Sequence, residues 1–255
     1  MYRGIFDTHA HYDDARFDED RDALLCSLPQ KGVARVINCG VDLASSKTTL
    51  SLAHKYDYVY AAIGFHPEDC GDATDADFEA LLPLYGDPKV VAVGEIGLDY
   101  YWDTVPKETQ KAVFERQLIL ANELHKPVIV HDREAHADTL ALLKKHRPQG
   151  VLHCFSGSVE SMEEAVKLGL YIGLGGAVTF KNAKKPLAVA AAAPADRLLL
   201  ETDCPYMAPV PFRGKRNDSS LISYVAEVIA SVRGVEVQQL IDQCRENANR
   251  LFGID

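Results

Sequence analysis

Short apolar segments alternate with longer amphipathic segments along nearly the whole chain, and this alternation limits the folds that are possible. The apolar segments are typical of buried parallel strands, and a helical pattern follows each of them. Eight such pairs in 255 residues predict an α/β protein with a single closed (β/α)8 TIM barrel, and we expect one domain over residues 1–255. The alternative is an open, doubly wound sheet, but the G-x-G-x-x-G turn of its dinucleotide-binding members does not follow the first strand here.

In a parallel barrel, all strands end at the same face, and active residues gather there. The expected strands cover residues 3–7, 34–39, 58–63, 90–94, 128–130, 150–152, 170–173 and 198–200. The expected helices cover residues 20–30, 44–55, 76–85, 107–125, 134–145, 159–168, 186–193, 221–233 and 237–252.

Composition excludes several classes of protein. Apolar residues make up 47%, enough for a full core, and no long uncharged apolar segment indicates a membrane span. The N-terminal residues enter the first expected strand at once, so we expect no signal peptide. The six cysteines are scattered without a C-x-x-C pair, which favours reduced thiols in a cytoplasmic protein. No obligate protein partner is indicated.

The formal net charge of −10 argues against a surface that coats nucleic acid broadly. It does not exclude a phosphate-binding cleft, because bound metal ions bring their own positive charge. The charge therefore restricts the size of a nucleic-acid site rather than its existence.

The first apolar segment leads directly into His9-Ala-His11. Residues two apart on a strand point to the same face, so the two imidazoles should project side by side. Two imidazoles on one rigid face form half of a transition-metal site. On its own, such a pair is structural as often as it binds metal. A metal site therefore requires further ligands from other strands.

Residue types that ligate metals follow five of the eight expected strands. Each alone is more often a structural residue, but their coincidence at one face predicts metal binding. The predicted ligands are His9, His11, Glu95, His131, His153 and Asp203.

Six ligands exceed the number that one open tetrahedral site uses, so we expect two divalent ions. Two ions roughly 3.5–4 Å apart stabilise both the attacking and the leaving oxygen in a displacement. Glu95 is the candidate bridge because a carboxylate offers two oxygens. The mixed nitrogen and oxygen set suits Zn, Mn, Co or Mg.

Six sequence blocks in combination resemble the signature of the TatD family, metal-dependent deoxyribonucleases of the amidohydrolase-like superfamily of TIM barrels. The blocks are Asp7-Thr-His-Ala-His11, Gly64-Phe-His-Pro67, Gly94-Glu-Ile-Gly-Leu-Asp-Tyr-Tyr101, His153-Cys-Phe-Ser-Gly157, Glu201-Thr-Asp-Cys-Pro205 and Arg213-Gly-Lys-Arg-Asn217. The resemblance covers residues 3–252. It implies a divalent-metal hydrolase that acts on DNA phosphodiesters, often as a 3′→5′ exonuclease on single strands, and it gives metal ligation to all six residues named above.

Two positions depart from the family pattern. Asp218-Ser219-Ser220 stands where many members have an acid followed by proline, and we expect Ser219 to serve as an N-cap. Asp132 replaces a small polar residue and should add negative charge near a phosphate site.

The mechanism we expect is hydrolysis of a phosphodiester by water. Asp203 would ligate a metal ion and also accept the proton of the attacking water as general base, unless it is a ligand only. His66 would contact substrate or donate a proton to the leaving oxygen, unless it is a turn histidine before Pro67.

Cations near the strand ends are candidates for substrate binding. Arg133 lies two residues past His131, and its planar fork suits bidentate phosphate contact, although an ion pair with Asp132 or Glu134 is equally plausible. Arg213 and Arg216, with Lys215 between them, should overhang the barrel mouth as a phosphate rim.

Other residues near the ligands have open roles. The segment Tyr100-Tyr101-Trp102 either stacks bases, as in single-strand binding proteins, or packs over the barrel top. Glu201 should orient a ligand rather than bind metal. Cys154 and Cys204 should point into the barrel wall and pack.

Three functions remain in competition. The first is a metal-dependent DNA phosphodiesterase acting on single strands. The second is a metal-dependent amide or ester hydrolase, for example an aminoacyl-tRNA deacylase; relatives of that kind often carry a modified lysine where this chain has Glu95. The third is a barrel that holds metal and binds nucleic acid without cutting it, and the presence of Asp203 argues against it.

Overall fold

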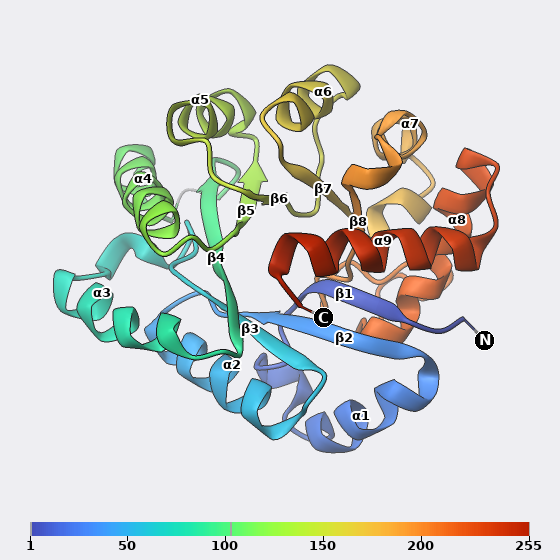
Figure 1. The fold of residues 1–255 in the computed structure, drawn as a ribbon, viewed down its shortest axis with the longest axis horizontal. Helices are drawn as coiled ribbons and strands as arrows, with labels where there is room; N and C mark the ends of the chain where they lie inside the picture. Colours follow the sequence, from blue (N-terminus) through green and yellow to red (C-terminus); the bar gives the residue numbers. More distant parts are fainter. Residues whose placement is uncertain (1, 103, 255) are drawn as a thin grey trace.

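Strands and helices alternate through residues 2–102 and 104–254, the part of the chain that this computed structural model describes (Figure 1). The eight strands of this part form one sheet, in which sequence neighbours pair in parallel. They are β1 (Ile5–Ala10), β2 (Val33–Cys39), β3 (Val59–Ile63), β4 (Val90–Asp99), β5 (Val128–Arg133), β6 (Gly150–Leu152), β7 (Tyr171–Leu174) and β8 (Leu198–Leu200).

The sheet closes where β1 meets the segment that follows β8. The amide of Asp203 donates to the carbonyl of His9 over 2.9 Å, and the amide of His11 donates to the carbonyl of Cys204 over 2.8 Å. This is the (β/α)8 barrel that the alternation predicts, and the open doubly wound sheet is excluded.

Helices surround the barrel on the outside (Figure 1). They are α1 (Arg21–Ser27), α2 (Leu43–Lys55), α3 (Asp75–Leu81), α4 (Lys107–Glu123), α5 (His136–His146), α6 (Val159–Lys167), α7 (Lys184–Ala192), α8 (Ile222–Arg233) and α9 (Val237–Phe252). None of the helices in the described ranges is long and apolar enough to span a membrane.

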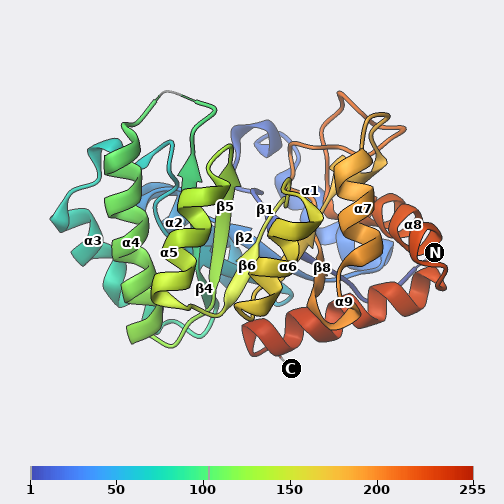
Figure 2. The same cartoon turned by 90° about the horizontal axis from the view of Figure 1, so that it is seen from above.

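The two ends of the barrel differ. Inward-facing side chains such as Phe6 and Ile129 form a buried apolar cluster with Leu251, Phe252 and Ile254 at the end of α9. Figure 2 shows α9 crossing one end of the barrel, while the loops after β4 and β8 rise at the other. The end near α9 is therefore filled by apolar packing, and the polar site can form only at the carboxyl ends of the strands.

Three strands are longer than their apolar segments predict. β1 extends to Ala10, β4 to Asp99 and β5 to Arg133, so His9, Glu95 and His131 lie within strands rather than beyond their ends. Register irregularities occur between Asp7 and Ala10 and between Val93 and Ile96. Irregularities of this kind re-aim side chains next to active sites, and polar residues that face such a site interrupt the apolar pattern without ending the strand.

Two helices are shorter than predicted. The expected helices 20–30 and 76–85 end as α-helices at Ser27 and Leu81 and continue as 3-10 turns, Leu28–Lys31 and Leu82–Gly86. Each turn has a proline at its start, which cannot donate the backbone hydrogen bond that an α-helix requires. The other expected helices of the described chain end within two residues of their predicted positions.

The expectation that Ser219 is an N-cap is wrong. The Asp218 side chain caps the turn before α8 by accepting from the Ser220 amide. The Ser219 hydroxyl instead donates to Asp7 Oδ2 over 2.7 Å. The charged carboxylate of Asp7 is a strong acceptor for this hydroxyl, and the contact ties the turn before α8 to β1.

Candidate metal centre

Glu95 lies at the middle of a cluster of histidines at the carboxyl ends of the strands. Its Oε2 is 3.1 Å from His9 Nε2 and 3.4 Å from His11 Nε2. Its Oε1 is 2.8 Å from His131 Nδ1 and 2.7 Å from His153 Nε2. The two oxygens of one carboxylate thus face two different pairs of histidines, as a bridging ligand would.

Asp203 completes the first of these groups. Its Oδ1 is 3.6 Å from His11 Nε2 and 3.8 Å from His9 Nε2. The Asp203 side chain is 21% exposed, whereas that of His9 is fully buried. Asp203 is therefore the predicted ligand that solvent reaches most easily in this group.

Hydrogen bonds fix which nitrogen of each histidine faces the centre. His11 Nδ1 lies 2.9 Å from the carbonyl of Cys39, so Nδ1–H donates and Nε2 keeps its lone pair. His131 Nε2 lies 2.9 Å from Asp99 Oδ2, so Nε2–H donates and Nδ1 faces Glu95. Histidines that ligate metals are oriented by such partners on the other ring nitrogen.

Replacing Asp99 with asparagine should weaken metal binding about 10- to 100-fold, because the amide no longer accepts the His131 proton as a carboxylate does. Titration of Mn²⁺ into the apo protein measures this directly. Asp196→Asn is the matched control, because that side chain is 60% exposed and its ion pair with Arg197 is 4.0 Å long. Equal affinity in the Asp99 variant and the wild type would mean that Asp99 does not orient a ligand.

Two buried polar atoms of this region, His153 Nδ1 and Glu201 Oε2, have no hydrogen-bond partner. Glu201 Oε1 accepts from the Cys154 amide and lies 3.8 Å from His153 Nδ1. Gly173 makes room for this carboxyl, because a Cβ there would lie 2.3 Å from Glu201 Oε2. Glu201 thus lies behind His153, on the side away from Glu95.

Charge within the cluster keeps the carboxylates ionised. Burial raises the pKa of Glu95, but its electrostatic interactions and hydrogen bonds with the surrounding histidines outweigh burial, and the pKa lies well below its usual range. Burial also raises the pKa of Asp203, and its contacts with His11 and His9 outweigh that effect. Burial lowers the pKa of His9 to about 4, so this imidazole stays neutral, as a metal ligand must be.

The donor set fits divalent cations of borderline or hard character. It consists of imidazole nitrogens and carboxylate oxygens, with no cysteine among the converging atoms. Among the described residues, three groups of three donors lie close enough to share an ion: His9, His11 and Asp203; His9, Glu95 and His153; and His66, Glu68 and His131. The six predicted ligands all fall in these groups, and His131 is joined to the others through Glu95 Oε1, 2.8 Å from its Nδ1.

His66 lies beside this cluster at the end of β3. Its Nε2 is 3.5 Å from Glu95 Oε1, and its Nδ1 accepts from the Glu68 amide. Burial lowers the pKa of His66, whereas the charge of Glu95 raises it. The net effect is a pKa above the usual value. His66 is thus buried beside the cluster and also belongs to the turn at Pro67, since its carbonyl accepts from the Asp69 amide. Its contact with substrate stays a prediction.

Arg133 does not form the alternative ion pair with Asp132 or Glu134. Its guanidinium carbon lies 3.9 Å from the centre of the Tyr101 ring. Asp132 instead pairs with His136 at 2.5 Å, so its charge is neutralised at the start of α5 rather than directed at a phosphate. The effect of Asp132 on a phosphate site stays a prediction.

The cations after β8 differ in their contacts. Arg213 is exposed and covers the Phe180 ring at 3.7 Å. Arg216 forms two hydrogen bonds with Asp20, of 2.7 and 2.6 Å, and donates to the carbonyl of Arg16. Arg213 is thus more available to a substrate than Arg216, whose charge an acid already neutralises.

The remaining residues near the ligands divide between packing and exposure. Tyr100 donates to Asp138 over 2.7 Å and packs against α5, while Tyr101 and Trp102 are exposed. Cys204 is fully buried as expected, whereas Cys154 is half-buried.

Sequence reasoning missed Asp99 and Asp7. Asp99 is four residues past Glu95 on β4, within the Leu98-Asp-Tyr100 block, and only the pairing of β4 with β5 brings it to His131. Asp7 is two residues before His9, and an acid inside an apolar strand is the signal that could have identified it.

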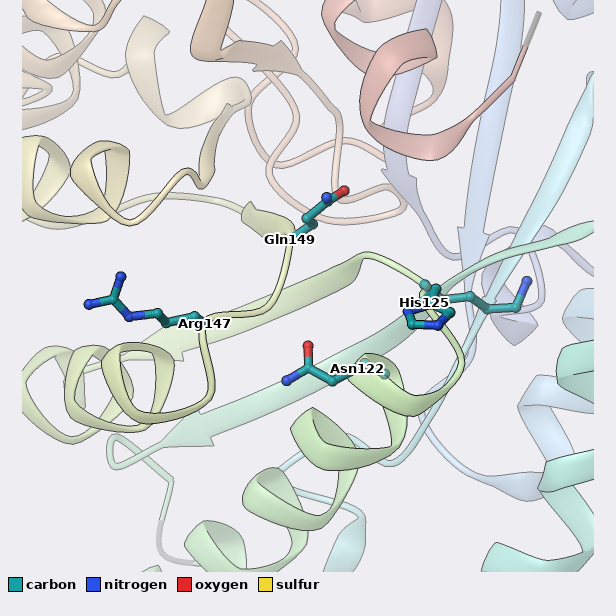
Figure 3. A pocket seen from close by; sticks show the side chains of 6 residues that line it. Asn122, His125, Arg147 and Gln149 are labelled. Atoms are coloured by element: carbon teal, nitrogen blue, oxygen red, sulfur yellow. The ribbon is translucent and has the colours of Figure 1, made fainter.

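A cavity of about 220 Å³ lies away from this cluster, near the N-terminal ends of β5 and β6 (Figure 3). It is lined by Ala121, Asn122, His125, Lys126, Arg147 and Gln149. None of these residues is a predicted ligand or substrate contact, and the carbonyls at the ends of α4 and α5 disfavour an anion there. The histidine and carboxylate cluster is therefore the stronger candidate for the functional site.

Proteins of known name resemble this chain over its full length. The metal-dependent hydrolase YabD of Bacillus subtilis, described as uncharacterized, is 43% identical over 98% of this chain and 100% of its own. A 3′-5′ ssDNA/RNA exonuclease, TatD, of Klebsiella pneumoniae is 37% identical over 98% of both chains. The crystal structure of the TatD homologue YJJV of Escherichia coli superposes with a TM-score of 0.94 at 35% identity and full coverage of both chains.

The barrel and its donor cluster define a metal-dependent hydrolase with the TIM-barrel fold. The sequence also matches the model of one family, described as TatD related DNase, over residues 6–253. The chain belongs to the TatD family.

Proposed function

We propose that this enzyme hydrolyses phosphodiester bonds of single-stranded DNA from the 3′ end, using two divalent metal ions. One observation carries the proposal: the two oxygens of Glu95 face separate pairs of histidines, with Asp203 beside one pair. Relatives named as 3′-5′ exonucleases support the choice of nucleic acid over other substrates.

The proposed ligands divide around Glu95. His9, His11 and Asp203 would hold one ion and His131 and His153 the other, with Glu95 available to both. Bound divalent ions supply Lewis acidity to the phosphate and lower the pKa of water to near neutral. The protein itself contributes a buried set of donor atoms that are already oriented and do not need to rearrange during the reaction.

Asp203 has a second proposed role, as the general base. Its carboxylate is ionised and partly exposed, so it can both ligate and accept the proton of the attacking water. His66 lies on the other side of Glu95, where it can donate a hydrogen bond or proton to the leaving oxygen. The two groups therefore flank the position that a phosphate would take between them.

Exposed cations at the mouth hold the remaining phosphate oxygens. Arg133 and Arg213 stack on aromatic rings, which leaves the hydrogen-bonding edges of their guanidinium groups free. Arg216 is a weaker candidate because Asp20 already occupies its fork.

Cleavage of a short 5′-labelled single strand tests this function, with Mg²⁺ or Mn²⁺ and with EDTA as the control. We expect products that shorten from the 3′ end, no products with EDTA, and slower cleavage of the matching duplex. The proposal would be contradicted if DNA stayed intact with Mg²⁺, Mn²⁺, Co²⁺ and Zn²⁺ while an aminoacyl ester was hydrolysed. The same metal centre would then be that of an ester hydrolase.

A further inference from the structure

Tyr101 and Trp102 are unusually exposed for their size. They are the two most exposed large hydrophobic side chains of the described residues, at 50% and 47%. Their rings meet edge to face, with centroids 4.8 Å apart. Large apolar side chains exposed together mark binding sites, and the hydrolysis proposed above gives these two no role.

Arg133 joins this pair from the neighbouring strand. Its guanidinium carbon is 3.9 Å from the centre of Tyr101 and 5.6 Å from that of Trp102. The pairing of β4 and β5 fixes this arrangement, because Arg133 lies opposite Asp99 and its carbonyl accepts from the Tyr100 amide. Among the residues described, no carboxylate forms an ion pair with Arg133, so the group keeps an exposed positive charge.

The aromatic pair is connected to a predicted metal ligand through one buried carboxylate. Asp99 Oδ1 accepts from the amides of Tyr101 and Trp102, over 2.9 and 3.1 Å. The other oxygen of Asp99 accepts from His131. Gln110 holds Asp99 in turn, donating to its carbonyl and accepting from its amide. The exposed rings are therefore positioned against the metal centre rather than carried on a free loop.

An unpaired nucleobase fits this combination. Every base has a π face that stacks on aromatic rings, and an adjacent arginine adds both a cation–π contact and a fork for the next phosphate. A base inside a duplex is already stacked and paired, so it cannot use the rings without being flipped out.

We propose that Tyr101, Trp102 and Arg133 form a stacking platform that seats an unpaired base of the substrate strand beside the metal centre. This inference rests on the proposed nuclease function, which it extends to the residues that select a single strand.

Trp102 is the single tryptophan of the chain, so its fluorescence reports this platform alone. The probe is a phosphorothioate oligothymidylate, which resists cleavage, added to the wild-type enzyme with Mg²⁺. We expect quenching that saturates together with binding measured by anisotropy of labelled DNA, and none with a duplex or with inorganic phosphate. Binding of the single strand without any change in fluorescence would overturn the proposal, as would failure of the strand to bind.

Variants separate stacking from a structural role. Trp102→Ala and Tyr101→Ala should each raise KM for single-stranded DNA by roughly 5- to 100-fold, with a smaller change in kcat. Trp102→Phe should retain most of the affinity because it keeps an aromatic face. Ile119→Ala is the matched control, since Ile119 is also exposed, at 44%, but lies on α4.

The two proposals fail in different ways. Quenching and binding without cleavage would overturn the nuclease function and leave the platform intact. Cleavage with unchanged KM in Trp102→Ala and Tyr101→Ala would overturn the platform and leave the nuclease function intact.

Discussion

Replacing Asp203 with asparagine is expected to lower kcat for single-stranded DNA by roughly 10²- to 10⁴-fold, the usual contribution of a general base. Asparagine is similar in size but cannot accept a proton from water at neutral pH. Because this change leaves the stacking residues and cations in place, affinity for the strand should remain within a few-fold of the wild type. Single-turnover cleavage and anisotropy measure the two quantities separately.

Asp203 could also act as a ligand alone, and the metal concentration separates the two roles. If Asp203 is only a ligand, saturating Mn²⁺ should restore most of the rate in Asp203→Asn. If it is also the base, the rate stays low however much metal is added. Asp196→Asn, at an exposed site near the other end of β8, should behave as the wild type.

Replacing Asp7 with alanine is expected to lower the free energy of unfolding by at least about 3 kcal/mol. The Asp7 carboxylate is fully buried and accepts four hydrogen bonds. The donors are the amides of His9 and Thr202 and the hydroxyls of Thr202 and Ser219. Alanine leaves these buried donors without this partner and removes the side-chain contacts that join β1 to the segments after β8.

Thermal unfolding measures this effect. For a chain of this size, a loss of 3 kcal/mol should lower Tm by roughly 6–12 °C. Asp7→Asn keeps one acceptor oxygen and the shape of the side chain, so it should lose clearly less. A Tm of Asp7→Ala equal to that of Asp196→Ala would show that this buried network adds nothing to stability.

Sequence patterns were sufficient for the barrel and for the convergence of the predicted ligands. The reason is topological: in a closed parallel barrel, residues that follow different strands necessarily meet at one face. His9, Glu95 and His153 are distant in sequence but share that face, so no contact information is needed to bring them together.

The pairing of side chains across strands could not be predicted in this way. Asp99 meets His131, and Arg133 meets Tyr101, only through the register of β4 with β5. Arg216, predicted as a phosphate contact, instead forms an ion pair with Asp20, which lies 196 positions away in the sequence. A single sequence contains no signal for such partners, because each depends on packing between distant segments.

The number of metal ions bound per chain tests the central claim most directly, since the claim is that Glu95 joins two ions in one centre. Equilibrium binding of Mn²⁺ should give two ions for the wild type and no more than one tightly bound ion for Glu95→Gln. A wild type that binds a single ion, or a Glu95→Gln variant that still binds two with unchanged affinity, would contradict the account.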